Sequence, residues 1–209
     1  FEKIKKLLPR KKIISYAIKK SADVSWDPLI KTTLLGEYNK ENILASYACC
    51  ISLGISRESL YKGIASFILP KGRFEMVYDG DFKVIIDFAH TSYAIERVLS
   101  TIKKEILGVS SGRLIHIFGS AGQRDAIKRP KMGRARACFA DVIILTEEDH
   151  RTERVEDICD QIMKGMKKNA KKPLKTFIIY SRDDAIKKGI SLAQKGDVVV
   201  ITGKGHEKS

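Results

Sequence analysis

Five short apolar runs alternate with amphipathic segments over the second part of the chain. The runs are continuous, which is typical of strands covered by helices on both faces. They lie at Val84–Phe88, Leu114–Phe118, Val142–Thr146, Phe177–Tyr180 and Val198–Thr202. The intervening segments repeat apolar residues at helical spacing and predict helices at Tyr93–Ile106, Lys128–Phe139, Val155–Asn169 and Asp183–Ala193. This alternation predicts an α/β fold with a Rossmann-like, mostly parallel sheet and helices on both faces.

The first part of the chain is mainly helical in pattern. Asn39 is a candidate N-cap for a helix that Gly54 would end, and Ser56 is a candidate N-cap for a second helix. Pro70-Lys71-Gly72 then interrupts the pattern. We therefore expect two domains, at residues 1–70 and 71–209.

Charged residues follow four of the predicted strands at their carboxyl ends. Parallel strands end at one edge of a sheet, where open α/β folds bind ligands. The residues expected there are Asp87, His90, Arg124, Asp125, Lys128, Glu148, Asp149, His150, Arg151, Lys204, His206 and Glu207. Both signs of charge recur at most of these ends, which favours ligand binding over ordinary loop polarity. Asp87 could instead cap the next helix, and His116, in mid-strand, is expected to be structural.

The loop after Leu114–Phe118 is rich in small residues. It reads Gly119-Ser120-Ala121-Gly122, and the charged residues Arg124, Asp125, Lys128, Arg129 and Lys131 follow it. Small residues let a backbone approach a ligand closely, and cations attract phosphate or carboxylate. The loop is not a Walker A motif, because the pattern Gly-x-x-x-x-Gly-Lys-Ser/Thr occurs nowhere in the sequence.

Composition narrows the function classes further. The formal net charge of +14 is explained by solvated helix faces or by attraction to anionic ligands such as nucleotides. Nucleic acid is not expected, because basic stripes interleaved with aromatics, zinc fingers and RNP-like motifs are absent from the sequence. No apolar run reaches the ~18 residues of a membrane span, and Phe1–Lys20 lacks the apolar region of a signal peptide.

The cysteines and histidines do not show metal-site spacing. Cys49, Cys50, Cys138 and Cys159 form no Cys-x-x-Cys pair and fall in segments with helical pattern, which predicts buried, reduced thiols and a reducing cytosol. A metal site built from His90, His150 and His206 is an alternative without supporting spacing.

Six short motifs occur in a fixed order along the chain. They are Gly36-Glu-Tyr-Asn-Lys-Glu-Asn42, Gly72-Arg-Phe-Glu75, Asp87-Phe-Ala-His-Thr91, Gly119-x-x-Gly-x-Arg-Asp125, Lys128-Arg-Pro-x-Met-Gly133 and Gly203-Lys-Gly-His-Glu207. From Ile13 to Glu207 this order resembles the Mur ligases, most closely those of the MurE type. The resemblance implies that residues 1–70 end the central ATP-binding domain and that residues 71–209 form a truncated, Rossmann-like C-terminal domain.

The resemblance also implies an activity, namely ADP-forming amide ligation in peptidoglycan precursor synthesis. ATP, with Mg²⁺, phosphorylates the carboxylate of UDP-MurNAc-L-Ala-D-Glu, and the amino group of an incoming amino acid attacks the acyl phosphate. The P-loop, the magnesium ligands and the UDP-sugar site would lie upstream of Phe1, so the chain alone would be inactive and would hold no metal.

The implied partners are small molecules: ATP, the amino acid and the UDP-MurNAc-dipeptide. The protein itself would be a cytoplasmic monomer. Neither nucleic acid nor a membrane is expected as a partner. The alternatives are another Mur ligase, a folylpolyglutamate synthase relative, or a non-catalytic basic module that binds nucleotides or nucleic acid.

Matching positions in the motifs imply roles for individual residues. The catalytic candidates are His90 and Lys128, and the ATP-binding candidates are Asn39, Asn42, Arg73 and Asp87. The amino-acid-binding candidates are Arg124, Glu148, Asp149, His150, Arg151, Gly203 and Glu207.

The stretch Glu148-Asp149-His150-Arg151 departs from the family's Asp-Asn-Pro-Arg motif. Arg151 is kept and would hold a second carboxylate, which favours meso-diaminopimelate over lysine as the added amino acid. Asp149 can only accept hydrogen bonds where asparagine also donates, and His150 loosens a backbone that proline would restrict. Near His90, Ser92 and Tyr93 replace the usual Pro-Asp pair, and Phe88 replaces tyrosine.

Overall fold

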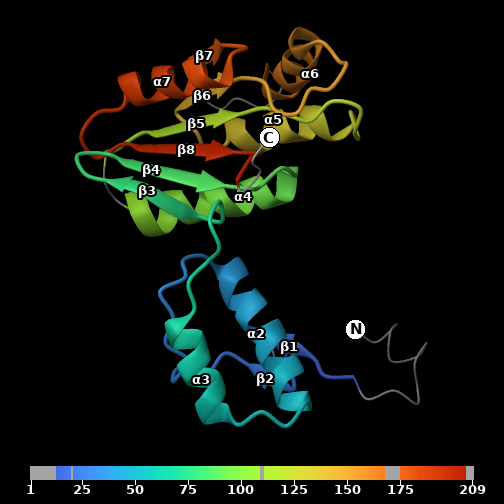
Figure 1. Cartoon of the computed structure of the whole chain (residues 1–209), viewed down its shortest axis with the longest axis vertical. Helices are drawn as coiled ribbons and strands as arrows, with labels where there is room; N and C mark the ends of the chain where they lie inside the picture. Colours follow the sequence, from blue (N-terminus) through green and yellow to red (C-terminus); the bar gives the residue numbers. More distant parts are fainter. Residues whose placement is uncertain (1–12, 20, 109–110, 168–174, 206–209) are drawn as a thin grey trace. The chain divides into compact units, whose positions relative to one another are not determined.

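The structure is a computed structural model that describes residues 13–19, 21–108, 111–167 and 175–205 (Figure 1). It divides into two compact units, Phe1–Ile68 and Leu69–Ser209. The change of unit falls beside Pro70-Lys71-Gly72, where the sequence pattern breaks.

The described part of the first unit contains the helices α2 (Glu37–Ser52) and α3 (Arg57–Ser66) and a minimal parallel pair, β1 (Tyr16–Ala17) and β2 (Val24–Ser25). Ser56 caps α3 as predicted, because its Oγ accepts a hydrogen bond from the Ser59 amide at 3.2 Å. The prediction that Asn39 caps α2 is wrong. Gly36 is the N-cap, and Asn39 lies inside the helix with its buried amide donating to the Leu35 carbonyl at 2.7 Å.

The second unit is built on a six-stranded sheet with the order β3-β4-β8-β5-β6-β7 (Figure 1). Its strands are β3 (Glu75–Asp79), β4 (Lys83–Asp87), β5 (Leu114–Phe118), β6 (Val142–Leu145), β7 (Lys175–Ile178) and β8 (Val198–Thr202). The edge strand β3 pairs antiparallel with β4, and all other pairs are parallel. The predicted α/β fold class is therefore confirmed. The sheet differs from a fully parallel one only at this edge hairpin.

Helices cover both faces of the sheet. One face packs against α4 (Ser92–Thr101), α5 (Lys128–Ala137) and α6 (Val155–Lys167), and the other against α7 (Arg182–Leu192). Alternate residues of β8 separate the two cores: Val198 and Val200 face α4, whereas Val199 and Ile201 face α7. This packing explains the continuous apolar runs, since both faces of each central strand are buried.

Helix α4 ends earlier than the sequence predicts. The helix expected over Tyr93–Ile106 is α-helical to Thr101 and widens into a π-helical segment, η1 (Ile102–Leu107). Ile102 and Leu107 remain buried, so the apolar pattern continues through the change of helix type.

The prediction of buried thiols holds for Cys159, which is 1% exposed. Burial, reinforced by Asp160 and Glu156, raises the pKa of this thiol to about 12. The prediction is wrong for Cys49 and Cys138, which are exposed. Among the described residues, no helix combines the length and apolarity that a membrane crossing would need.

Candidate functional site

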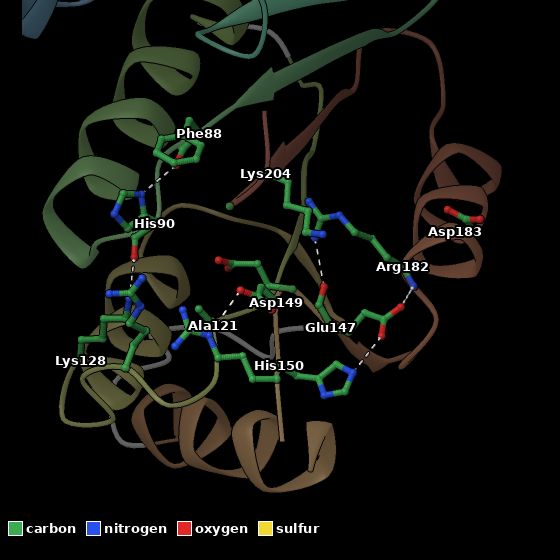
Figure 2. Close-up of a pocket in the computed structure, with 14 residues that line it drawn as sticks. Phe88, His90, Ala121, Lys128, Glu147, Asp149, His150, Arg182, Asp183 and Lys204 are labelled. Atoms are coloured by element: carbon green, nitrogen blue, oxygen red, sulfur yellow. Dashed lines mark hydrogen bonds and ion pairs between the residues drawn. The ribbon is translucent and has the colours of Figure 1, made fainter. Parts of the chain in front are cut away.

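A pocket of about 1110 Å³ opens at the carboxyl edge of the sheet (Figure 2). Strands β4, β5, β6 and β8 run parallel and therefore deliver the residues that follow them to this same edge. The pocket is lined by Phe88, His90, Ala121, Arg124, Lys128, Glu147, Glu148, Asp149, His150, Arg151, Arg182, Asp183, Gly203 and Lys204. Eight of these residues are catalytic or amino-acid-binding candidates from the sequence, and Lys204 was expected at the same edge.

The remaining predicted site residues lie elsewhere or outside the described part. Arg73 and Asp87 adjoin the pocket through Phe88 but are not among its lining residues. Asn39 and Asn42 belong to the first unit, where Asn42 is exposed on α2. Glu207, together with His206, lies outside the described residues.

Asp87 ends β4 with its carboxylate engaged by the backbone. Its Oδ1 accepts from the Ala89 amide at 2.7 Å, and its Oδ2 accepts from the Phe74 amide at 2.8 Å. Burial raises the pKa of this carboxyl, although the two amides and the charge of Arg73 oppose the shift. Asp87 does not cap α4, because Thr91 does so by accepting from the Ala94 amide at 3.2 Å. Asp87 thus shapes the turn that leads into the pocket.

A guanidinium group and two aromatic rings lie in contact beside this turn. The Arg73 guanidinium lies 4.3 Å from the Phe88 ring centroid, and the Phe88 and His90 rings meet edge to face at 4.9 Å. His90 Nδ1 is 3.1 Å from the Phe88 carbonyl, and the Lys128 ammonium reaches the His90 carbonyl at 3.5 Å (Figure 2). Arg73 and Lys128 therefore place positive charge on either side of the Phe88–His90 segment.

The glycine loop after β5 lies directly against the loop after β6. The Gly122 amide donates to the Asp149 carbonyl at 2.8 Å. A Cβ atom at Gly122 would lie 1.9 Å from the His150 carbonyl oxygen, and one at Gly119 would lie 2.4 Å from the Thr146 carbonyl oxygen. Glycine is needed at both positions because the backbones touch. The structure thus gives these glycines a role in loop packing.

The loop after β6 carries the charged residues 147–151. Arg151 adopts a left-handed backbone conformation with φ of +53°, and its Nε lies 3.5 Å from Asp149 Oδ2. His150 Nδ1 lies 3.1 Å from the Glu153 carbonyl, and its Nε2 lies 3.8 Å from Glu147 Oε2 (Figure 2). The Asp149–Arg151 pair is largely solvent-exposed, so its attraction is about 1 kcal/mol or less and leaves Arg151 able to bind another anion.

Residues that follow β7 line one side of the pocket, and this was not predicted from the sequence. Arg182 and Asp183 begin α7 and line the pocket. The Arg182 guanidinium donates to the carbonyls of Glu147 and Thr202, both at 3.2 Å, and so joins the loops after β6 and β8. The signal was available, because Phe177–Tyr180 was a predicted strand and its end belongs to the same edge.

His116 has the structural role predicted for it. Its buried ring lies in mid-strand, with Nε2 at 2.9 Å from the Thr202 hydroxyl. Within the described ranges, no group of three or more His, Cys, Asp or Glu side chains is arranged to hold a metal ion.

The pocket combines both signs of charge at close quarters. Its cations are Arg124, Lys128, Arg151, Arg182 and Lys204, and its acids are Glu147, Glu148, Asp149 and Asp183. Such a lining matches a ligand that carries carboxylate and ammonium groups together. The fold and the pocket thus define an α/β domain with a pocket lined by both signs of charge at the carboxyl edge of its sheet.

The family described as Mur ligase, glutamate ligase domain matches residues 72–205, and the chain belongs to this family. A 2,6-diaminopimelate ligase of UDP-N-acetylmuramoyl-L-alanyl-D-glutamate from Aquifex aeolicus is 41% identical over 84% of the chain and 35% of its own length. The ligase of the same name from Trichormus variabilis is 34% identical over 99% of the chain and 45% of its own length. The resemblance to Mur ligases seen in the sequence is confirmed, and the chain spans well under half the length of these relatives.

Solved structures agree with this assignment. A structure of a ligase of the same name has 30% identity and a TM-score of 0.58, and covers 98% of this chain and 45% of that one. Folylpolyglutamate synthase from Mycobacterium tuberculosis has a TM-score of 0.63 at 20% identity over 84% of this chain and 39% of its own, which shows a shared fold alone.

Proposed function

We propose that this chain supplies the amino-acid-binding part of an ATP-dependent, ADP-forming ligase that adds meso-diaminopimelate to UDP-MurNAc-L-Ala-D-Glu. Residues 1–70 would be the end of its central ATP-binding domain, and residues 71–209 its C-terminal domain. The observation that carries the proposal is the pocket that holds Arg124 and Arg151 together with Glu148 and Asp149. The expected setting is a monomer in the cytoplasm.

The charges of the pocket suit a diamino diacid, which has a carboxylate and an ammonium group at each end. We assign one carboxylate to Arg124 and the distal carboxylate to Arg151, with Asp149 available to the distal ammonium group. We assign the remaining contacts with the distal end of the amino acid to Glu148, His150, Gly203 and Glu207. Each charge-assisted hydrogen bond of this kind contributes about 1.5–3 kcal/mol, so the contact with Arg151, which lysine cannot make, can separate diaminopimelate from lysine.

The residues beside Phe88 fit the phosphates and ribose of a nucleotide. Arg73 and Lys128 supply positive charge there, and the Phe88–His90 segment between them is held by the buried carboxylate of Asp87. ATP, when bound, supplies the phosphoryl group that activates the acceptor carboxylate. Asn39 and Asn42 are assigned to its adenine, and Mg²⁺ to ligands outside this chain.

Catalysis by these residues would consist of positioning and charge stabilisation. Arg124 and Arg151 orient the amino acid so that its amino group meets the activated carboxylate, which replaces a bimolecular encounter with a fixed geometry. His90 and Lys128 line the same pocket (Figure 2), where Lys128 can stabilise negative charge as it develops.

Phosphate release by the complete protein with ATP and UDP-MurNAc-L-Ala-D-Glu tests the proposal, with diaminopimelate and lysine compared. We expect diaminopimelate to be preferred. The Arg151→Ala variant should lower kcat/KM for diaminopimelate by about tenfold to a hundredfold, equivalent to one lost charged contact, with KM for ATP unchanged. Arg154→Ala is the matched control, because Arg154 is three residues away, 74% exposed and absent from the pocket lining. Preference for lysine, or equal losses in both variants, would refute the assignment.

A further inference from the structure

Arg129, at the start of α5, is among the largest fully buried side chains and is 1% exposed. Its guanidinium makes a two-pronged ion pair with Glu153, with Nη1 to Oε2 at 2.7 Å and Nη2 to Oε1 at 3.0 Å. Nη1 also donates to Gln161 Oε1 at 2.9 Å, and Nη2 to the Ala121 carbonyl at 3.1 Å. One side chain therefore ties together α5, α6 and the loops that follow β5 and β6.

Glu153 extends this connection to the backbone of the glycine loop. Its Oε1 accepts a hydrogen bond from the Gln123 amide. The Gln123 side chain donates to the Thr152 hydroxyl at 2.5 Å, beside the bond from the Gly122 amide to the Asp149 carbonyl. The hydrogen bond from Arg129 lowers the pKa of Glu153 to about 2, with help from the Gln123 amide, so Glu153 is ionised near neutral pH.

Both of the loops that meet here contain a strained residue. Gln123 has φ of +50° and Arg151 has φ of +53°, in the left-handed region that non-glycine residues enter at a cost of about 1–3 kcal/mol. Such conformations persist where surrounding contacts hold them. Gln123 donates hydrogen bonds to both Glu153 and Thr152, and the next residue in the chain is Arg124.

Stability alone does not account for the arrangement. An ion pair whose arginine is buried can contribute little net stability, because desolvation of the guanidinium offsets the attraction to Glu153. Arg129 Nε is also buried, without a hydrogen-bond partner among the described residues. What the contacts do determine is the spacing between the loop with Arg124 and the loop with Asp149 and Arg151.

We propose that Arg129 and Glu153 are positioning residues that clamp these two loops at the separation required by the amino-acid ligand. This inference rests on the proposed function, because it assumes that Arg124 and Arg151 hold two ends of the same molecule. Neither Arg129 nor Glu153 lines the pocket, so their effect on the ligand is indirect.

Glu153→Gln is the test variant, because it keeps the side chain's size but turns an NH₂ group toward the guanidinium. Asp197→Asn is the matched control. Asp197 also forms an arginine–carboxylate pair, with Arg113 at 2.6 Å, but it precedes β8 at the opposite edge of the sheet. Amide hydrogen exchange of Gly122 and Gln123 in the full chain reports on the loops. Steady-state kinetics of the complete protein with meso-diaminopimelate and ATP report on the site.

We expect Glu153→Gln to speed exchange at Gly122 and Gln123 at least tenfold and to raise KM for diaminopimelate tenfold or more. KM for ATP should stay within twofold of the wild-type value. Asp197→Asn should change neither the exchange rates of Gly122 and Gln123 nor KM for diaminopimelate. The split between the two KM values matters, because a general loss of structure would affect both ligands.

Exchange that is no faster than in Asp197→Asn overturns the clamp, and so does faster exchange with an unchanged KM for diaminopimelate. Wild-type protein that uses no diamino acid defeats the proposed function and the positioning role together. In that event the exchange measurement separately shows whether the loops are held.

Discussion

Replacement of Gly122 by alanine tests how closely the two loops that follow β5 and β6 at the pocket must approach. The added Cβ would lie 1.9 Å from the His150 carbonyl oxygen, and ordinary contact begins near 3.4 Å, so the loops would have to separate by about 1.5 Å. Gly122 does not have a positive φ, so alanine can adopt its backbone conformation, and the obstacle is the steric clash alone. The separation also breaks the 2.8 Å bond from the Gly122 amide to the Asp149 carbonyl.

The magnitude follows from these two losses. Overpacking costs about 1–3 kcal/mol, and the lost hydrogen bond adds about 0.5–1.5 kcal/mol. We therefore expect Gly122→Ala to lower the free energy of unfolding by about 2–4 kcal/mol. The displacement also moves Arg124 relative to Arg151 by about 1 Å or more, a misplacement that can reduce the rate with diaminopimelate about a hundredfold.

Urea unfolding of the full chain and phosphate release by the complete protein measure the two effects. Gly63→Ala is the control, because a Cβ at Gly63 meets nothing within 4 Å. Since Gly63 lies inside α3, alanine there should stabilise the protein by about 0.5–1 kcal/mol without affecting turnover. A Gly122→Ala variant with wild-type stability and wild-type KM for diaminopimelate would refute the argument that this contact sets the pocket.

Two further predictions concern ionisable groups. Burial opposes ionisation of Asp197, but the side chain and amide of Arg113 outweigh it and hold the pKa of Asp197 below its ordinary value. Asp197→Asn should therefore lower the free energy of unfolding by about 2 kcal/mol at pH 7. This difference should shrink as the pH falls below about 4, where the unfolded carboxyl takes up a proton and the native pair is lost; a pH-independent difference would contradict it. In native protein at pH 8, iodoacetamide should modify the exposed Cys49 and Cys138 and spare Cys159, whose thiol is buried and protonated; mass spectrometry that finds Cys159 modified at an equal rate would contradict this.

The fold was accessible from the sequence because its information is local. Leu114–Phe118 and Val198–Thr202 are continuous apolar runs, and the structure places both as strands with the predicted bounds. The direction of the strands then brings Arg124, Arg151 and Gly203 to one pocket without any knowledge of side-chain contacts. The widening of α4 at Ile102 has no comparable signal, because the apolar spacing continues through it.

The clamp could not be predicted from local pattern. Arg129 lies in a run of charged residues that resembles an exposed, ligand-binding stretch, yet it is 1% exposed. A buried guanidinium is tolerable only where acceptors surround it. Its acceptors Glu153 and Gln161 are 24 and 32 residues away, so their convergence depends on how α6 packs against α5.

The crowding of opposite charges explains why this pocket needs rigid walls. Acids and cations on flexible loops would pair with one another, as Asp149 and Arg151 partly do at 3.5 Å, and each pair so formed would weaken the attraction for a ligand. The Arg182 guanidinium donates to the carbonyls of Glu147 and Thr202, and these hydrogen bonds join the loops after β6 and β8. Arg129 holds the loops by a different contact, because it pairs with Glu153, an acid outside the pocket lining. Loops held by such contacts limit how far the pocket's acids and cations can approach one another, which favours binding of a zwitterion over pairing within the pocket.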